Sequence, residues 1–326
     1  MIYNPVPRVC LYPDRQVPEL SARIVAAGRM LADAGRVKLV EPGETADLAH
    51  AVGDAPTYGP APVRLRTVAA VPLRAGRLTA APGWVRRQRR AGADVVWLAH
   101  GQTAARLLLD AGIAPAGRLH CLPLLAPPIG TLSPSRAVER AAVRDGLGLR
   151  PGERLVIGTE GGSDTGDEPG WVRELREIKR SDAVVLRMRP ADRVHGAYRV
   201  HAERVGWLPE PLPLSALLAG CDVFVAADAQ PTACTPAAAA ADWGIPVVAR
   251  ATDAASDLVL AGGRGTVVPA GAWRVARAVA DQLDGGIFNH AGTAPPDPGR
   301  RDAELARALL AVYRRTVRRT IAAGAA

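Results

Sequence analysis

Residues 221–249 read CDVFVAADAQPTACTPAAAAADWGIPVVA and hold three secondary-structure signals in succession. An apolar run at 222–226 predicts a buried strand, and an alanine-rich run at 232–242 predicts a helix. Gly244 and Pro246 then form a turn that leads into a second apolar run. A strand, a helix and a second strand in this order are the repeating unit of a parallel, doubly wound sheet. The segment therefore predicts an α/β fold.

The same alternation extends over the rest of the chain. Further strands are expected at 8–12, 37–40, 47–53, 63–71, 94–99, 118–122, 155–158, 183–188 and 265–269, and further helices at 20–34, 102–111, 138–148 and 170–179. A segment rich in proline and glycine at 126–136 separates two such series and is the predicted connector. At 326 residues the chain exceeds the usual size of a single core. We therefore expect two domains, at 1–125 and 135–285, followed by a last helix at 302–321.

Composition and charge narrow the function classes. Hydrophobic residues make up 48% of the chain and charged residues 22%, which is typical of a globular protein. The formal net charge of +9 favours anionic partners. No basic motif interleaved with aromatic residues points to specific nucleic-acid binding. The densest basic run holds Arg86, Arg87, Arg89 and Arg90. It is interpreted as a solvated helix face, with peripheral membrane contact as the alternative.

The cysteines and the N-terminus indicate the cellular compartment. The four cysteines lack paired spacing, so neither a metal site nor a disulfide framework is expected. The N-terminal residues MIYNPVPRVCLYP lack the pattern of a signal peptide, and no apolar run is long enough to span a membrane. A reduced, cytoplasmic protein is the expectation.

Several phrases of the sequence resemble one enzyme family. These are DVVWLAHGQTAARLLLDAGIAPAGRLHCLPL at 94–124, LGLRPGERLVIG at 147–158, VGWLPEPLPLSALLAGCDVFV at 205–225 and GIPVVA at 244–249. They are similar to segments of the GT-B glycosyltransferases, in the retaining group that includes glycogen synthase. The resemblance implies two Rossmann-like domains that face a cleft, with the last helix returning to the first domain. It also implies transfer of a sugar from a nucleotide sugar, which is a substrate and not a cofactor, to an unknown acceptor.

The chain departs from this family at its most diagnostic positions. The family's paired glutamates fall on Pro231 and Ala239. The family's basic residues are missing from the loop that follows 155–158, which is acidic here. A divergent member is therefore expected. One alternative is a catalytically degenerate relative that binds a ligand or partner, and another is a GT-B-shaped epimerase or phosphoryl-transferring enzyme.

The resemblance also suggests where a donor would bind. Backbone amides and helix N-termini at the carboxyl edge of a parallel sheet attract phosphate. The expected donor-binding residues lie at the ends of the strands at 155–158, 183–188 and 222–226 or in the segments that follow them. They are Gly158, Glu160, Gly161, Gly162, Arg187, Arg189, Asp228, Thr232 and Thr235. The bland alternatives are an irregular surface loop and ordinary surface charge.

Three histidines lie in strand segments. His50, in DLAHAVGD, resembles a family phrase near the acceptor cleft, and His100 ends the strand DVVWLA. Both are candidate catalytic residues, although a lone histidine at a strand end is often structural. His120 lies in an apolar strand and is expected to be a core residue.

Overall fold

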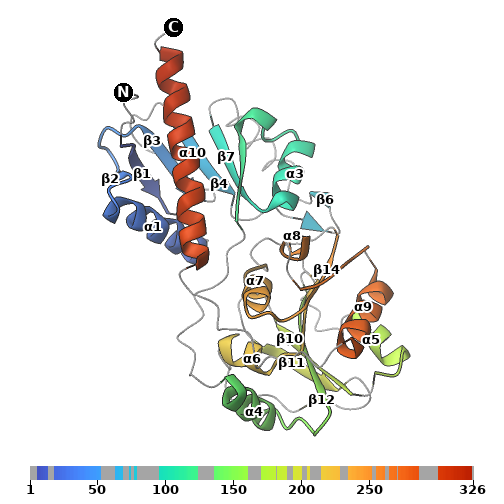
Figure 1. Cartoon of the computed structure of the whole chain (residues 1–326). Coiled ribbons are helices and arrows are strands. Elements are labelled where there is room, and N and C mark those ends of the chain that lie inside the picture. The colour runs from blue at the N-terminus through green and yellow to red at the C-terminus, as the bar shows by residue number, and fades with distance from the viewer. Residues whose placement is uncertain are drawn as a thin grey trace. The chain divides into compact units, whose positions relative to one another are not determined.

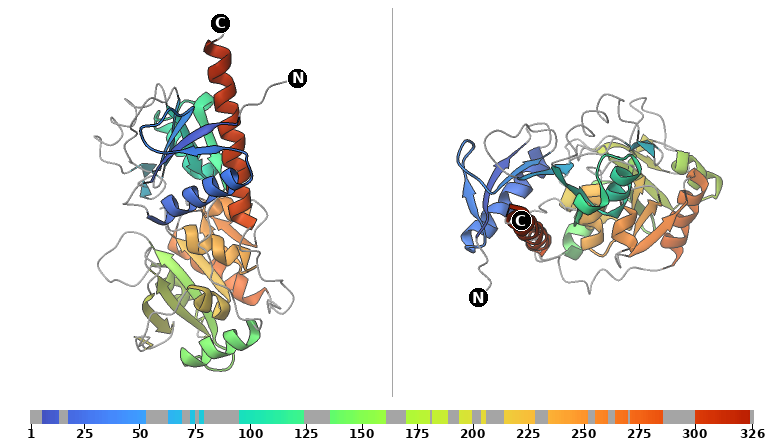
Figure 2. Two further views of the ribbon diagram at one scale, coloured as in Figure 1. Left: turned by 90° about the vertical axis from the view of Figure 1, so that its left-hand side faces the viewer. Right: turned by 90° about the horizontal axis from the view of Figure 1, so that it is seen from above.

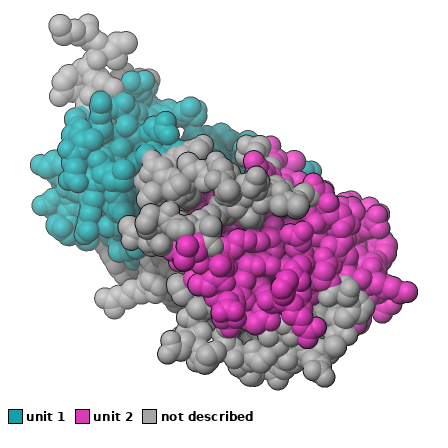
Figure 3. Space-filling view, turned by 60° about the horizontal axis from the view of Figure 1, so that its bottom comes forward, with its two compact units in different colours: residues 1–72, 77–125, 298–326 teal, residues 73–76, 126–297 magenta. Residues whose placement is uncertain are grey.

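The structure is a computed structural model of the chain. It describes residues 6–13, 18–52, 63–68, 73–74, 77–78, 95–123, 136–160, 170–180, 182–188, 194–199, 204–205, 214–227, 234–251, 255–260, 264–269, 271–285 and 300–324. The chain divides into two compact units, coloured teal and magenta in Figure 3. Unit 1 comprises Met1–Pro72, Arg77–Leu125 and Pro298–Ala326, and unit 2 comprises Leu73–Gly76 and Ala126–Asp297. The predicted connector lies largely outside the described residues.

Unit 1 is built on a six-stranded sheet in the order β2-β1-β3-β4-β7-β8 (Figure 1). Its strands are β1 (Arg8–Tyr12), β2 (Lys38–Val40), β3 (Leu48–Val52), β4 (Val63–Val68), β7 (Val95–His100) and β8 (Leu119–Leu122). Each neighbouring pair in this sheet is parallel. Two short strands, β5 (Leu73–Arg74) and β6 (Arg77–Leu78), lie between β4 and β7 in the chain, β5 in unit 2 and β6 in unit 1.

The helices of unit 1 are α1 (Pro18–Asp33), α3 (Gln102–Asp110), the 3₁₀ turn η1 (Ala116–Arg118) and α10 (Arg300–Gly324). Helices α1 and α10 lie side by side and share one apolar core with the sheet (Figure 2). On α10, Leu305, Leu309 and Tyr313 repeat every four residues and are fully buried in that core. The last helix therefore returns to the first unit, as predicted.

Unit 2 contains a seven-stranded sheet in the order β12-β11-β10-β9-β13-β14-β15. Its strands are β9 (Arg154–Glu160), β10 (Ala183–Met188), β11 (Val194–Arg199), β12 (Arg204–Val205), β13 (Val223–Ala227), β14 (Val247–Arg250) and β15 (Gly265–Val268). Strands β10, β9, β13, β14 and β15 pair in parallel in this order. Strands β11 and β12 add two antiparallel pairs at the β10 edge. The sequence analysis did not predict β11, because VHGAYR lacks an apolar run. The two sheets confirm the predicted α/β fold of two Rossmann-like domains.

Helices cover both faces of the sheet of unit 2. They are α4 (Arg136–Gly146), α5 (Gly170–Glu177), α6 (Leu214–Gly220), α7 (Cys234–Asp242), α8 (Ser256–Leu260) and α9 (Ala272–Asp284). Helices α5 and α9 pack on one face in a core that includes Val156 and Val225. Figure 1 shows α6 and α7 on the opposite side of this sheet.

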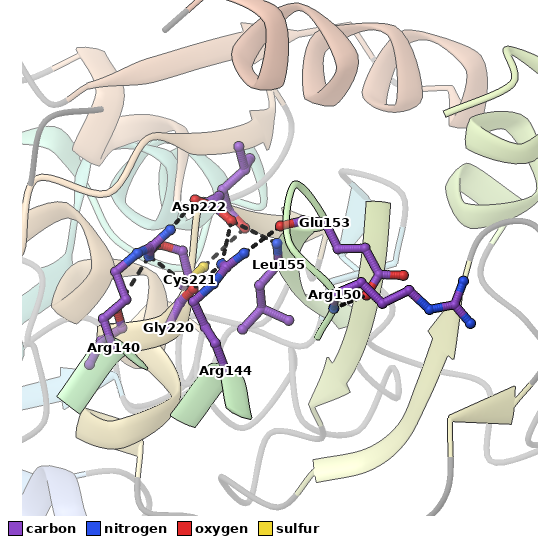
Figure 4. A network of polar contacts seen from close by, with 10 residues as sticks. Arg140, Arg144, Arg150, Glu153, Leu155, Gly220, Cys221 and Asp222 are labelled. Atoms are coloured by element: carbon purple, nitrogen blue, oxygen red, sulfur yellow. Dashed lines mark hydrogen bonds and ion pairs between the residues drawn. The ribbon is translucent and has the colours of Figure 1, made fainter. Parts of the chain in front are cut away.

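At the amino end of the sheet of unit 2, one carboxylate joins four elements (Figure 4). Asp222 lies just before β13, and its Oδ2 accepts hydrogen bonds from the backbone N–H of Leu155 on β9 at 2.7 Å and from Arg144 at 3.0 Å. Its Oδ1 pairs with Arg140, the second arginine of α4 in this cluster. The Nη1 atom of Arg140 also donates to the carbonyls at the end of α6, including that of Gly220 at 3.0 Å. Asp222 therefore joins α4, α6, β9 and β13.

We expect Asp222→Asn to lower the free energy of unfolding by about 3 kcal/mol, because it leaves two partly buried guanidinium groups without their carboxylate. Urea denaturation followed by circular dichroism measures this change. The matched control is Asp281→Asn, whose carboxylate pairs with Arg277 in the exposed i,i+4 position. That change should cost no more than about 0.5 kcal/mol. Equal losses for both variants would contradict the structural role of Asp222.

Candidate functional site

The sheet of unit 2 has a topological switch point between β9 and β13. From β9 the chain passes through α5 to β10 on one side, whereas β13 lies on the other side of β9. Open α/β sheets bind ligands at the carboxyl ends of the strands that flank such a point, because the connecting loops diverge there. The carboxyl ends of β9 and β13 are therefore the candidate binding edge of unit 2.

Strand register brings three of the predicted donor-binding residues to this edge. Gly158 on β9 is paired with Arg187 on β10 and with Val225 on β13. Glu160 is the last residue of β9 and is paired with Ala227, the last residue of β13. Gly158, Arg187 and Glu160, predicted from separate segments of the sequence, thus lie within two neighbouring rows of paired residues across the sheet.

The other predicted donor-binding residues are only partly described. Thr235 is the second residue of α7, the helix that follows β13. Gly161, Gly162, Arg189, Asp228 and Thr232 lie outside the described residues, as do Arg86, Arg87, Arg89 and Arg90. Their predicted roles therefore remain predictions.

Gly158 has a packing role that the sequence analysis missed. A Cβ atom at this position would lie 2.5 Å from Cζ2 of Trp171, whose ring belongs to α5 and is 3% exposed. The missing side chain is what allows α5 to approach β9 so closely. The apolar periodicity of α5 placed Trp171 on a helix, but it did not show that its ring lies against a glycine of the sheet.

Helix α7 contributes packing and few polar atoms. Ala237, Ala238, Ala239 and Ala240 are all fully buried. Small side chains allow the helix to pack closely on the sheet. Ala239, where the family resemblance would place a glutamate, is therefore part of the core.

In unit 1, His50 is held on both ring nitrogens. Its Nδ1 lies 2.7 Å from the hydroxyl of Tyr313 on α10, and its Nε2 lies 2.7 Å from Oγ1 of Thr67 on β4. The side chain is fully buried, and this burial, with a smaller contribution from His100, lowers its pKa from 6.5 to about 3. His50 is thus neutral, with one nitrogen donating and the other accepting. His50 thus links the sheet to α10 within the core, whereas its predicted contact with a substrate stays a prediction.

His100 ends β7 and has one unpartnered nitrogen. Its Nδ1 donates to the carbonyl of Pro123 at 2.8 Å, so Nε2 carries the free lone pair. In the described part of the chain, Nε2 has no hydrogen-bond partner, and the residue is 6% exposed. Burial and the nearby charge of Arg23 lower the pKa of His100 to about 4, against the Pro123 hydrogen bond, which raises it.

Arg23 of α1, whose charge acts on His100, also has an unpartnered buried atom. Its Nη2 pairs with Asp302 at the start of α10, whereas its Nη1 is buried and has no partner among the described residues. The lone pair of His100 Nε2 can accept a hydrogen bond, and the N–H of Arg23 Nη1 can donate one. Arg23 could not be predicted from the sequence, because a single arginine on a helix carries no motif.

The sequence predicted that His120 is a core residue, and this prediction is wrong. It is half-buried on β8, and partial burial together with the charges of Arg315 and Arg319 lowers its pKa.

Strand β8 ends the sheet of unit 1, so one of its edges is unpaired within that sheet. Within the described residues, no helix is both long and apolar enough to cross a membrane.

Comparison with known proteins defines the class of fold. No family model and no curated protein matches the chain. Among solved structures, it is similar to WaaG, a glycosyltransferase involved in lipopolysaccharide biosynthesis, with 12% identity and a TM-score of 0.54 over 94% of this chain and 99% of that one. It is also similar to Anabaena HepE in complex with UDP and glucose, with 14% identity and a TM-score of 0.57 over 98% and 99%.

A third similar structure is sucrose-phosphate synthase from Thermosynechococcus elongatus. The identity is 12% and the TM-score 0.57, over 98% of this chain and all of that one (100%). At these identities the similarity concerns the fold. The chain therefore has the GT-B fold of glycosyltransferases, with two Rossmann-like units.

Stability should fall as the pH is lowered from 6.5 towards 4. The unfolded chain binds a proton at His50 and His100 near pH 6.5, whereas the folded chain binds them only near pH 3 and 4. The free energy of unfolding then falls by up to about 1.4 kcal/mol per pH unit for each histidine. His100→Asn removes one titrating group and retains a donor for the Pro123 carbonyl. We expect it to halve the histidine-dependent slope in urea titrations at several pH values, and an unchanged slope would contradict the assignment.

Gly158→Ala should destabilise unit 2 by about 1–3 kcal/mol, because the added methyl group overlaps the ring of Trp171. Trp171→Leu removes the ring that causes this overlap. The double variant Gly158→Ala/Trp171→Leu should therefore lose less unfolding free energy than the sum of the losses in the two single variants. Chemical denaturation of the four proteins measures the coupling. Gly146→Ala is the control, since its Cβ would meet no atom within 4 Å. Strictly additive losses would show that the close approach is not the cause.

Proposed function

We propose that the chain transfers a sugar from a nucleotide sugar to an acceptor, with the donor bound at the carboxyl ends of β9, β10 and β13. The observation that carries this proposal is the topological switch point at β9 and β13, where α/β sheets bind nucleotides. The GT-B fold supports it, since WaaG is a glycosyltransferase and HepE was crystallised with UDP and glucose. A cytoplasmic location remains the prediction made from the sequence.

In this proposal, the leaving diphosphate is recognised by backbone amides and arginines. Gly161 and Gly162 follow β9 and offer amides without obstructing side chains. Arg187 lies on the neighbouring strand, in register with Gly158, and Arg189 follows two residues later. Positive charge placed beside the diphosphate stabilises its departure, and such groups are commonly worth about 3 kcal/mol each.

Other residues would hold the remainder of the donor and the acceptor. Asp228, Thr232 and Thr235 follow β13, where carboxylate and hydroxyl groups suit the hydroxyls of a ribose or sugar. Glu160, at the end of β9, adds a carboxylate to the same edge. In unit 1, the unpartnered Nε2 of His100 is the proposed contact with a substrate hydroxyl.

A second candidate is a GT-B relative that binds a nucleotide without turnover. The observation that favours it is Ala239, which is fully buried and carries no polar atom in its side chain at the position of the expected glutamate. The sequence also lacks the two basic residues expected in the loop after β9. Both candidates place the nucleotide at the same edge, so they differ in turnover rather than in binding.

A panel of nucleoside diphosphates and their sugars distinguishes the two candidates. A ligand at about 100 times its Kd should raise the Tm by roughly 5–10 °C. Arg187→Ala/Arg189→Ala should weaken binding at least tenfold, whereas the exposed control Arg173→Ala/Arg274→Ala should not. Release of nucleoside diphosphate from the sugar donor would support the transferase, and binding without release would support the second candidate. No binding to any member of the panel would contradict both.

A further inference from the structure

The outward face of α10 concentrates arginines. Arg314, Arg315, Arg318 and Arg319, together with Ala311, line a hollow of about 460 Å³. The spacing i, i+1, i+4 and i+5 places these guanidinium groups on adjacent rows of the helix within roughly 8 Å along its axis. The sequence contains no aspartate or glutamate after Glu304. The C-terminal part of α10 therefore carries positive charges and no acidic residue between them.

Several arginines elsewhere in the described structure are paired with carboxylates. Arg23 pairs with Asp302, Arg140 and Arg144 with Asp222, and Arg180 with Asp182 and Asp284. By contrast, no carboxylate among the described residues pairs with Arg314 or Arg315.

Two observations describe how the arginines of the hollow act on neighbouring elements. The Nη1 atom of Arg319 donates to the carbonyl of Gly117 at 3.1 Å, which orients this side chain across η1. The charges of Arg315 and Arg319 also contribute to the lowered pKa of His120 on β8. The charges of Arg315 and Arg319 thus reach a neighbouring strand of the sheet.

Stability of the helix does not account for this arrangement. A cation in the last turns of a helix interacts favourably with the macrodipole, by about 0.3–1 kcal/mol for an exposed group. The last turn of α10 contains no basic residue, so this interaction does not explain the arginines at 314–319. Four in one hollow repel one another, and that repulsion is relieved when an anion binds between them.

We propose that Arg314, Arg315, Arg318 and Arg319 form a binding site for phosphate groups on unit 1. Arginine matches phosphate because its planar guanidinium donates two parallel hydrogen bonds to two phosphate oxygens. The hollow falls within the range of about 300–1,000 Å³ that small ligands occupy. The cluster is compact, whereas a nucleic-acid site extends along several phosphates. The phosphate is supplied by a free phosphorylated molecule or by a phospholipid headgroup.

This site goes beyond the proposed transfer reaction and does not rest on it. Its residues belong to α10 in unit 1, and the proposed donor residues belong to unit 2. A result at one site therefore leaves the other open to a separate test.

The experiment compares three full-length proteins at an ionic strength of about 0.15 M. They are the wild type, Arg314→Gln/Arg315→Gln, and the matched control Arg29→Gln/Arg36→Gln, which removes two exposed charges from the same unit. Inorganic pyrophosphate is titrated by calorimetry as the free-phosphate probe. Vesicles of phosphatidylglycerol, with phosphatidylcholine vesicles as the neutral reference, are pelleted as the headgroup probe.

We expect the Arg314/Arg315 variant to lose at least tenfold in affinity for one probe, while the control variant keeps at least half of the wild-type affinity. Loss confined to pyrophosphate supports a free phosphorylated ligand, and loss confined to vesicles supports a headgroup. Absence of binding to both probes in the wild type would overturn the site, as would equal loss in the control variant or retained binding in the Arg314/Arg315 variant. If the double variant does not fold, Arg315→Gln replaces it, because Arg315 is exposed.

Discussion

The carboxylate of Asp222 holds β9 and β13 together at their amino ends, and the candidate site of unit 2 lies at the other end of these strands. Asp222 accepts the N–H of Leu155, and its own N–H donates to the carbonyl of Leu155 at 2.8 Å. Two arginines of α4 neutralise the charge that this geometry brings into a largely buried position. Since parallel strands keep one register along their length, the pairing of Glu160 with Ala227 at the opposite end of the strands follows from this contact.

A comparable constraint acts in unit 1, where it is carried by neutral groups. His50 lies between Thr67 of the sheet and Tyr313 of α10, with the rings of His50 and Tyr313 edge to face at a centroid distance of 5.8 Å. Burial favours the uncharged imidazole, which can then donate at one nitrogen and accept at the other. The contact fixes which face of α10 meets the sheet. Because the helix repeats every 3.6 residues, it also directs Arg314, Arg315 and their neighbours outward.

Apolar periodicity was sufficient to predict most of the secondary structure. Strands β1 and β10 were predicted with their observed bounds, and α10 was placed within two to three residues at its ends. The antiparallel strand β11 was missed, because VHGAYR contains neither an apolar run nor a strict alternation of apolar and polar residues. Long-range contacts were beyond this reasoning: the role of His50 depends on Tyr313, 263 residues away in the chain. Likewise, Gly158 was predicted as a ligand contact, whereas its missing side chain also makes room for Trp171.

Packing limits where polar chemistry can occur in unit 2. The alanines of α7 are buried against the sheet, so a charged side chain at Ala239 would have to enter the core or displace the helix. Gly158 is similarly closed to larger side chains by Trp171. In the proposed function, a nucleotide at this edge is therefore recognised by groups beyond these packed positions, in the segments that follow β9, β10 and β13. The departure at Ala239 agrees with this division, because it places a packing residue of α7 where the family resemblance implies a glutamate.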